Sequence, residues 1–498
     1  MTGSATLRMA GWDARLQLRY GFYAVYAVLT VAYVLGLALV PPAFRERTLV
    51  LLVLTDPSVL GFYFVSALVL IEKREGTLDA LAVSPLGVRG YLVAKLVSLT
   101  ALAVAASLAL ALLARPRGVA LPLLVGGVAL TSAFFVSVGL VAVSRFDTVE
   151  DYFFSALGYG AVMFAPLAGY LGVFETPLFW LLPARPARLL VAGAFEGIAA
   201  WELAYAVGYL LVGTVGCLFV ARRRFERDVL GGRSTGRSRV ARTGTGGRPA
   251  RWLAARTGPV GALVLADLRN WTRDPILLLA GSGPFALALL GRVALPVLDV
   301  QYLPSVALEP LYPTVLAFVF LFPGYVLGMV VGFLVLEDRA QGVLDDLRRT
   351  PLTGRGYLRY RGTTAYLLAF GVTLAVVPLF GLVIVSLPLL VATAAVAGLV
   401  GPAVVFLFAA LASDAIEGLA LNKLLGLVVL VPPVGVLVVP EPLEYVVGLV
   451  PLYWPTKALL VGVEGGSALE VGVLLGVGVL ALGGTLAALV RRFEARVR

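Results

Sequence analysis

The sequence predicts an all-α polytopic membrane protein made of two parallel six-helix repeats. Of its 498 residues, 60% are hydrophobic and only 14% are charged, and its mean hydropathy is +0.95, which lies outside the usage of soluble domains. Apolar stretches of about 20 residues, the length of a helix that crosses a bilayer, recur along the chain. A polar segment near residue 80 returns near residue 350. We therefore expect about 12 transmembrane helices, arranged as a pseudo-dimer.

The expected spans form two sets of six, separated by charged or Pro/Gly-rich segments. The first set covers 22–42, 52–71, 91–113, 120–143, 152–174 and 199–221. The second set covers 276–296, 313–336, 364–387, 388–412, 424–440 and 468–489. This predicts a first six-span unit at 1–225, a basic flexible linker at 226–258 and a second six-span unit at 259–498. The linker is rich in Gly, Ser, Thr and Arg and has too few apolar residues to fold.

Arginine residues predict the orientation of the chain. Segment 222–256 holds eleven arginines against two acidic residues, and the positive-inside rule places such a segment in the cytosol. Six spans in each unit then place both termini in the cytosol. Arg45, Arg47, Arg115 and Arg117 fall on the opposite side in this arrangement. Topology and attraction to anionic lipid head groups account for the basic run, so no nucleic-acid partner is expected.

The duplication is clearest in a polar loop, where apolar composition cannot produce it by accident. Residues 76–92, GTLDALAVSPLGVRGYL, return as residues 342–358, GVLDDLRRTPLTGRGYL, with 10 of 17 positions identical. Ahead of the first span of each unit, Asp13, Arg15 and Arg19 match Asp267, Arg269 and Arg273. Charged residues mixed with Leu and Trp at that position suit a helix lying in the membrane interface. Both repeats therefore run in the same direction.

Several kinds of chemistry are excluded by the residues that the sequence lacks. The chain has no histidine, and its single cysteine, Cys217, lies in an expected span. The usual general base, the usual zinc ligand and a Ser-His or Cys-His pair are therefore missing, and we expect neither catalytic residues nor a metal site. There is also no GxxxxGK[ST] phosphate loop. The chain is not expected to hydrolyse ATP by itself.

The repeated loop has the pattern of a short amphipathic helix. Leu78 and Leu81 lie one helical turn apart, with Asp79 on another side. Ser84-Pro85 and Thr350-Pro351 have the form of a helix cap followed by proline at the first helical position, leading into the third span. A rigid helix of this kind suits the transmission of force from a soluble partner. An ordinary interfacial helix resting on lipid would show the same periodicity.

From Glu72 to Lys95 the pattern E-K-x-E-G-T-L-x-A-L-x-V-[ST]-P-L, followed by Y-L-x-x-K, resembles the second-to-third-span loop of type-2 ABC exporter permeases. It is most similar to the fluoroquinolone or multidrug export permeases, and the similarity extends to 17–33 and 56–73. The resemblance implies two permease units fused in tandem, working with two copies of a separate nucleotide-binding subunit that holds ATP and Mg. No cofactor is implied in this chain.

The resemblance also implies roles for individual residues. The implied coupling residues are Glu72, Gly76, Leu78, Asp79, Leu81, Pro85, Asp338, Gly342, Leu344, Asp345, Leu347 and Pro351. The implied connecting helices are 7–20, with Asp13, Arg15 and Arg19, and 261–274, with Asp267, Arg269 and Arg273. The second copy has diverged, with Asp338 in place of Glu72 and Arg361 in place of Lys95.

In such exporters the substrate passes between the second and fifth spans of the two units. The aromatic candidates there are Phe62, Phe64, Tyr159, Phe164, Tyr170, Phe320, Phe322, Tyr325 and Phe333. Aromatic rings suit flat, amphiphilic or cationic drugs, although helix packing explains such residues equally well. The implied function is export of a hydrophobic or amphiphilic drug or lipid-like substrate across the plasma membrane of a prokaryote.

Three alternatives remain at this point. A secondary drug/proton antiporter would place ionisable groups near midplane, where Arg292 is the main candidate. A membrane-embedded lipid-modifying enzyme would need a polar constellation, for which the chain offers Asp147, Glu150, Glu196 and Glu202. A structural membrane scaffold is the third alternative. Copurification of an ATP-binding subunit would separate the exporter from all three.

Overall fold

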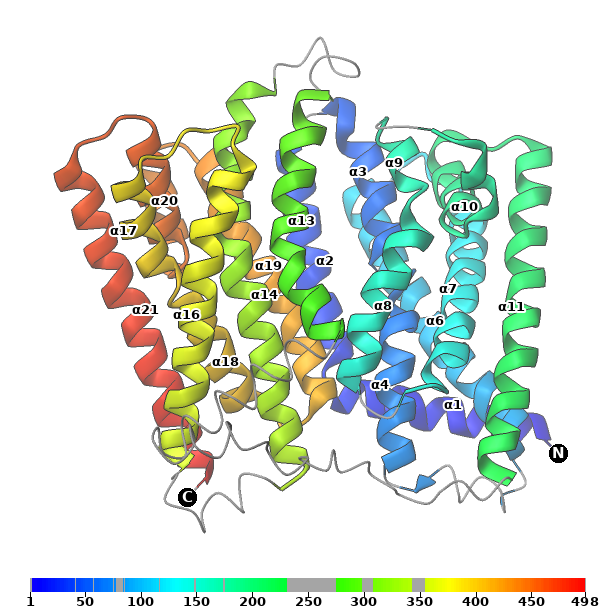
Figure 1. The fold of residues 1–498 in the computed structure, drawn as a ribbon. Helices are drawn as coiled ribbons and strands as arrows, with labels where there is room; N and C mark the ends of the chain where they lie inside the picture. Colours follow the sequence, from blue (N-terminus) through cyan, green and yellow to red (C-terminus); the bar gives the residue numbers. More distant parts are fainter. Residues whose placement is uncertain are drawn as a thin grey trace. The chain divides into compact units, whose positions relative to one another are not determined.

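A computed structural model describes residues 2–40, 42–56, 58–74, 76–77, 84, 86–115, 117–146, 149–172, 175–230, 275–297, 308–342 and 354–497. The chain divides into two compact units, Met1–Arg239 and Val240–Arg498. Every regular element in the described residues is a helix, as Figure 1 shows. This confirms the predicted all-α fold. The division between the units falls inside the predicted linker 226–258, whose own limits stay a prediction.

Unit 1 is a bundle centred on α7. Its α-helices are α1 (Thr2–Arg19), α2 (Phe22–Leu39), α3 (Pro42–Thr55), α4 (Leu60–Arg74), α6 (Gly87–Ala114), α7 (Leu121–Val143), α8 (Val149–Phe164), α9 (Leu167–Tyr170), α10 (Ala184–Glu196) and α11 (Ala200–Leu230), with a 3-10 helix η1 (Pro177–Leu181). Helix α7 packs against α4, α6, α10 and α11. A Cβ atom on Gly139 would lie 2.9 Å from the Phe62 carbonyl oxygen, so this glycine allows α4 to approach α7 closely.

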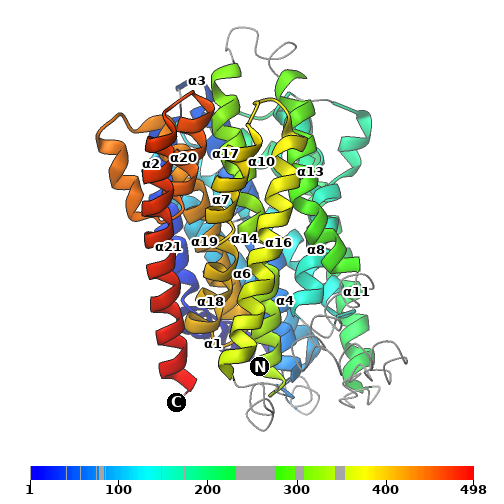
Figure 2. The ribbon, with the colours of Figure 1, turned by 60° about the vertical axis from the view of Figure 1, so that its left-hand side comes forward.

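Unit 2 is centred on α14. Its helices are α13 (Pro275–Val297), η3 (Glu309–Leu311), α14 (Tyr312–Ala340), α16 (Gly354–Phe380), α17 (Leu387–Ala397), α18 (Val400–Leu411), α19 (Ala415–Val438), η4 (Leu443–Leu449), α20 (Tyr453–Val463) and α21 (Ala468–Val497). Figure 2 shows α14, α16 and α21 aligned along the height of this unit. A Cβ atom on Gly328 would lie 2.7 Å from the Gly401 carbonyl oxygen, the same device as at Gly139.

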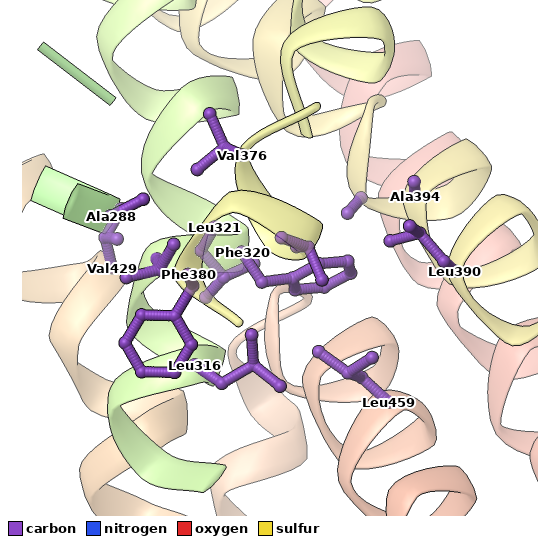
Figure 3. Packing of buried hydrophobic residues seen from close by; sticks show 13 residues of the cluster. Ala288, Leu316, Phe320, Leu321, Val376, Phe380, Leu390, Ala394, Val429 and Leu459 are labelled. Carbon is purple, nitrogen blue, oxygen red and sulfur yellow. The ribbon is translucent and has the colours of Figure 1, made fainter. Parts of the chain in front are cut away.

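One cluster of apolar side chains in the core of unit 2 joins several of its helices. Phe320 of α14 lies in this cluster with Phe380 of α16, Leu390 of α17 and Leu459 of α20 (Figure 3). Each of these four side chains is at most 2% exposed. Burial of apolar surface thus joins α14 to the helices around it.

The order of the elements is the same in both units. A second-span helix, α4 or α14, is followed by α6 or α16, and the fourth span is α7 or the pair α17–α18. Further along, η1 and η4 precede the short helices α10 and α20, which lead into the long helices α11 and α21. The two tandem repeats predicted from the loop are therefore present in the fold.

The predicted number of spans is not reached. In the described residues eight helices are long and apolar enough to cross a membrane, or nine if α1 and α2, bent by 63°, count together. The predicted span 52–71 is divided into α3 and α4, because Asp56-Pro57 interrupts the apolar run. The predicted span 152–174 is divided into α8 and α9, with Pro166 at the cap position of α9. Shorter helices therefore replace several of the expected spans.

Candidate functional site

A buried cluster of charges lies where the repeated loop of unit 1 joins the helix bundle. The Lys95 ammonium is 2.7 Å from Asp13 Oδ1 and 2.6 Å from Glu72 Oε1. The Tyr91 hydroxyl donates a 2.5 Å hydrogen bond to Glu72 Oε2. The side chains of Lys95 and Asp13 are fully buried. We call these four residues the first anchor.

The first anchor joins three elements that are far apart in the sequence. Glu72 lies in the last turn of α4, just before the loop. Tyr91 and Lys95 lie one turn apart on α6, just after the loop, so both face the same neighbour. Asp13 lies on α1, and one turn further along that helix the Gln17 Nε2 donates to Ser98 Oγ on α6 at 3.3 Å. Both ends of the loop are therefore tied to the connecting helix.

Burial makes the charges of the first anchor costly in free energy unless each charge is paired. A buried charge is tolerated only when it is paired and hydrogen-bonded, and removal of one partner leaves the other uncompensated. Lys95 serves two carboxylates at once, and Asp13 Oδ2 is buried without a hydrogen-bond partner. The first anchor therefore depends on Lys95 more than on any other member.

Unit 2 carries a counterpart at the same positions of the repeat. Arg361 Nη2 lies 2.8 Å from Asp338 Oδ2, and Arg361 Nε donates to the Tyr357 hydroxyl at 3.1 Å. The Tyr357 hydroxyl in turn donates to Asp338. The Asp338 side chain is 23% exposed, whereas that of Glu72 is 9% exposed. We call Asp338, Tyr357 and Arg361 the second anchor.

Both loops also begin with the same backbone turn. Gly76 follows α4 with a φ of 71°, and Gly342 follows α14 with a φ of 73°, in the left-handed region that favours glycine. Their N–H groups donate to the carbonyls of Lys73 and Arg339, at 3.3 and 3.1 Å. The structure therefore gives Gly76 and Gly342 a local role: each allows the chain to leave its helix.

A second pair of equivalent contacts lies beside these turns. Lys73 Nζ donates to the Phe146 carbonyl at 3.5 Å, and Arg339 Nη1 donates to the Ala412 carbonyl at 3.2 Å. Phe146 and Ala412 each follow the fourth-span segment of their repeat. The end of each second-span helix is thus attached to the end of the fourth span.

The remaining predicted loop residues lie outside the described part of the chain. These are Leu78, Asp79, Leu81, Pro85, Leu344, Asp345, Leu347 and Pro351, together with Asp267, Arg269 and Arg273 of the second connecting helix. The predicted cap at Ser84 was wrong, because α6 begins at Gly87 with Leu86 at its cap position.

The connecting helix α1 presents two different faces. Asp13 and Gln17 are buried, whereas Arg15 and Arg19 are exposed. On the exposed face Trp12 is 61% accessible, and the Arg15 guanidinium lies 5.0 Å from its ring centroid. A face of arginines and large apolar residues suits a helix in the membrane interface. Asp13 therefore acts within the protein, while Arg15 and Arg19 face outward.

The aromatic pathway candidates separate by burial. Phe62, Phe64, Phe320 and Phe333 are each at most 2% exposed. Phe64 packs on Phe22 with ring centroids 4.1 Å apart, which is core packing. Phe164 stacks on Phe135 with centroids 5.4 Å apart. Tyr159 is 52% exposed, while Phe322 and Tyr325 are half-buried and Tyr170 lines a polar cavity. Tyr159 and the half-buried Phe164, Tyr170, Phe322 and Tyr325 therefore remain the accessible pathway candidates.

Sequence reasoning missed one polar site between α3 and α4. Asp56 accepts hydrogen bonds from the hydroxyls of Tyr33 at 2.9 Å and Tyr26 at 3.3 Å, both on α2. In the ungapped alignment that pairs Glu72 with Asp338, the position of Asp56 is taken by Phe322, inside the continuous helix α14. The signal was a carboxylate within an expected span, which is a functional candidate by default.

Arg292, the residue named for an antiporter, has a structural partner. It is exposed, and its Nη1 donates to the carbonyl of Leu379, near the end of α16, at 3.1 Å. Of the residues named for an enzyme, Glu196 lines a polar cavity with Arg185 and Arg188. Glu202 accepts from the Ala199 N–H at the start of α11 at 3.4 Å, and the side chains of Asp147 and Glu150 lie outside the described residues. Among the described residues no group of three or more His, Cys, Asp or Glu side chains is suited to hold a metal ion.

The tandem helical repeats and their paired anchors define a duplicated, multi-pass membrane protein of the permease class. Residues 4–233 match the fluoroquinolones export permease protein family, and residues 267–490 match the fluoroquinolones export permease protein Rv2686c-like family. The chain belongs to the fluoroquinolones export permeases.

Two relatives from Mycobacterium tuberculosis (strain ATCC 25618 / H37Rv) illustrate the similarity. The fluoroquinolones export permease protein Rv2687c is 30% identical over 221 residues, which cover 44% of this chain and 93% of the relative. The fluoroquinolones export permease protein Rv2686c is 29% identical over 225 residues, which cover 44% of this chain and 88% of the relative. No solved structure matches the chain.

Proposed function

We propose that this chain is the transmembrane permease component of an ABC exporter. It moves a hydrophobic or amphiphilic substrate out of a prokaryotic cell, and a separate nucleotide-binding subunit supplies the ATP hydrolysis. Membership of a permease family supports a transporter subunit rather than an enzyme. The names of the relatives favour a drug of the fluoroquinolone kind as the substrate.

The observation that carries this proposal is the pair of anchors at the bases of the repeated loops. In unit 1, Lys95 joins the helix before the loop, the helix after it and the connecting helix through contacts of 2.6 and 2.7 Å. A push on such a loop moves all three elements together, because a buried, hydrogen-bonded ion pair resists separation. In unit 2, Arg361 and Asp338 provide the same connection at 2.8 Å. Two loops held in this way suit two copies of an ATPase subunit.

The rest of the assembly follows from this role. Each unit supplies one of the two permease units of such an exporter, and the partner subunits hold ATP and Mg in the cytosol. Both termini are cytosolic, as the basic segment 222–256 predicts. Membrane lipid contacts the outward faces of the bundles.

ATPase activity tests the proposal. The purified chain alone should release no phosphate from ATP, because it has no phosphate loop. Addition of its nucleotide-binding partner should give vanadate-sensitive turnover that a transported drug stimulates. Robust turnover by the homogeneous chain, or drug transport driven by a proton gradient without the partner, would contradict the exporter and favour an enzyme or an antiporter.

A further inference from the structure

A polar cavity of about 360 Å³ lies in unit 1 and is lined mainly by residues of α3, α9 and α10. Figure 1 shows α9 and α10 at the end of that unit opposite α1. The cavity is lined by Arg47, Gly169, Tyr170, Glu175, Arg185, Arg188 and Glu196. Three arginines face two carboxylates, so the lining carries a formal charge of 3 − 2 = +1. The anchors do not use this cavity, and Tyr170 is the one predicted pathway residue in its lining.

Two of the three arginines are deeper than the carboxylates. The side chain of Arg185 is 12% exposed and Arg188 is half-buried, whereas Arg47 is exposed. Glu175, the partner of Arg185 at 2.6 Å, is 64% exposed, and Glu196 is also exposed. Water screens an exposed carboxylate, so each one offsets a deeper guanidinium only in part. The inner part of the cavity, formed by Arg185 and Arg188, is therefore positive.

Arg188 has no ion-pair partner among the described residues. Its guanidinium carbon lies 5.1 Å from the Tyr170 ring centroid. The Nε atoms of both Arg185 and Arg188 are buried and have no hydrogen-bond partner in the part of the chain that the structure describes. Buried donors without acceptors are costly, and an oxyanion bound in the cavity would satisfy them.

The position of these arginines on α10 is also unfavourable without a ligand. Helix α10 begins at Ala184, so Arg185 and Arg188 lie in its first two turns. The N-terminal end of a helix carries a partial positive charge, which disfavours cations there and attracts anions. Burial lowers the pKa of Arg188, and the neighbouring Arg185 lowers it further. Arg185 and Arg188 therefore place positive charge at a helix N-terminus, where cations are unfavourable unless an anion is bound.

In unit 2 the cation at the position equivalent to Arg188 is neutralised by carboxylates of the protein itself. The sequence Pro186-Ala187-Arg188 of α10 corresponds to Pro455-Thr456-Lys457 of α20. Lys457 Nζ lies 2.8 Å from Glu444 Oε1 and 3.0 Å from Glu441 Oε1. Contacts with these two carboxylates raise the pKa of Lys457 against the opposing effect of burial.

The carboxylate that neutralises Lys457 has an exposed counterpart in unit 1. Glu444 lies in η4 and is 3% exposed. The register that pairs Arg188 with Lys457 pairs Glu444 with Glu175, which lies before η1 and has a 64% exposed side chain. Glu175 pairs with Arg185 at 2.6 Å. One repeat therefore buries its acid against the cation, whereas in the other the equivalent acid is exposed and contacts Arg185.

The surroundings of the cavity indicate what kind of molecule carries the anion. Trp180 of η1 lies 5.6 Å from Trp201, between ring centroids, and the Arg185 guanidinium lies 4.6 Å from the Trp180 ring centroid. Leu178 and Leu181 of η1 are 66% and 71% exposed. Tryptophan and tyrosine belts mark the depth of the lipid head groups. The cavity thus opens beside an apolar, aromatic surface of interfacial character.

We infer that the Arg185–Arg188 cavity of unit 1 binds the oxyanion of an amphiphile, a phosphate or a carboxylate, whose apolar part lies along η1. An anionic phospholipid and a carboxylate-bearing drug both have this chemistry. If the bound molecule is a drug, the inference rests on the proposed export function. If it is an anionic phospholipid, the inference is independent of that function.

Thermal stabilisation of the full-length chain in neutral detergent tests the inference, because a ligand that binds only the folded state raises Tm. Three probes are titrated: phosphatidylglycerol, inorganic phosphate and a fluoroquinolone. Each is compared with a matched reference, namely phosphatidylcholine, chloride at equal ionic strength and the methyl ester of the drug. The variants are Arg188→Gln, Arg185→Gln, the charge-conserving Arg188→Lys, and Lys457→Gln as the matched loss of one charge from unit 2.

At least one oxyanion should raise Tm above its reference in the wild type and in Lys457→Gln. Arg188→Gln and Arg185→Gln should each weaken the apparent affinity roughly tenfold, and Arg188→Lys should keep most of it. A response to phosphatidylglycerol alone assigns the lipid head group, and a response to the drug alone assigns the substrate carboxylate. The inference is overturned if no probe exceeds its reference, or if both glutamine variants respond as the wild type does. The assay needs neither transport nor the ATPase partner, so its failure is distinct from failure of the proposed function.

Discussion

The two anchors have the same geometry but different chemistry. In the first anchor a fully buried Lys95 contacts two carboxylates, one of them on α1. In the second anchor the described contact is between Arg361 and Asp338, whose side chain is partly exposed. An ammonium is a compact charge that needs several acceptors around it, whereas a guanidinium satisfies its donors in a planar fork. The two repeats therefore keep an ion pair between the second-span and third-span helices, although the residues that form this ion pair differ.

This difference predicts unequal sensitivity to loss of the cation. Lys95→Met should destabilise the chain by about 3–5 kcal/mol, because Asp13 and Glu72 are left buried and unpaired. Arg361→Met should cost clearly less, since water already reaches Asp338. Thermal unfolding of the purified variants measures both losses. Lys95→Arg controls for charge, and equal destabilisation by the two methionine variants would show that the anchors are equivalent.

The loops themselves should also respond unequally. Leu78→Asp should lower drug-stimulated ATPase activity and efflux together, because a charge placed in an apolar contact with the partner is not compensated. Leu344→Asp should have a smaller effect, since the second loop departs further from the family pattern. The membrane fold should be unchanged in both, as judged by Tm. If both variants bind the ATPase and export drug at the wild-type rate, the loops do not transmit force.

The two turns, in contrast, should behave alike. Gly76 and Gly342 have φ values of 71° and 73°, and any other residue is strained there. Gly76→Ala and Gly342→Ala should each lower stability by about 1–2 kcal/mol, the cost of the left-handed conformation for a residue with a Cβ. Gly11→Ala in α1, where a Cβ meets nothing within 4 Å, is the control. A large difference between the two turn variants in Tm would mean that the turns are not equivalent.

The smallest expected effect concerns the break between α3 and α4. Tyr33→Phe removes the 2.9 Å hydrogen bond to Asp56, which should cost about 1 kcal/mol. Tyr26 still donates to the same carboxylate, so the break should persist. A loss of Tm similar to that of Lys95→Met would show instead that Asp56 depends on Tyr33 alone.

The sequence was sufficient to predict the all-α class and the tandem repeat, because composition and a duplicated polar loop are both local signals. It also placed Glu72 and Lys95 in one motif. It did not predict that they contact each other and Asp13, since that contact joins positions 82 residues apart. The resemblance implied a coupling role for Glu72, which stays a prediction, and the structure buries its side chain in the first anchor.

The errors in the spans have a related cause. A hydropathy window averages over single polar residues. The predicted span 52–71 therefore ran across Asp56, and its first residues were not recognised as the end of a separate helix, α3. The same averaging joined α8 to α9 across Pro166. The cation at Arg188 was also missed, because Glu175, the counterpart of Glu444, contacts Arg185, and only the structure shows which arginine that acid meets.

The central claim is that both repeats meet an ATPase partner through their loops on one side of the membrane. Single cysteines at Asp79 and Asp345, in a Cys217→Ala background, test this with a membrane-impermeant thiol reagent. Both positions should be labelled only from the cytosolic face, and the nucleotide-binding subunit should protect both from labelling. Labelling of the two positions from opposite faces, or labelling that the partner does not reduce at either position, would contradict the account.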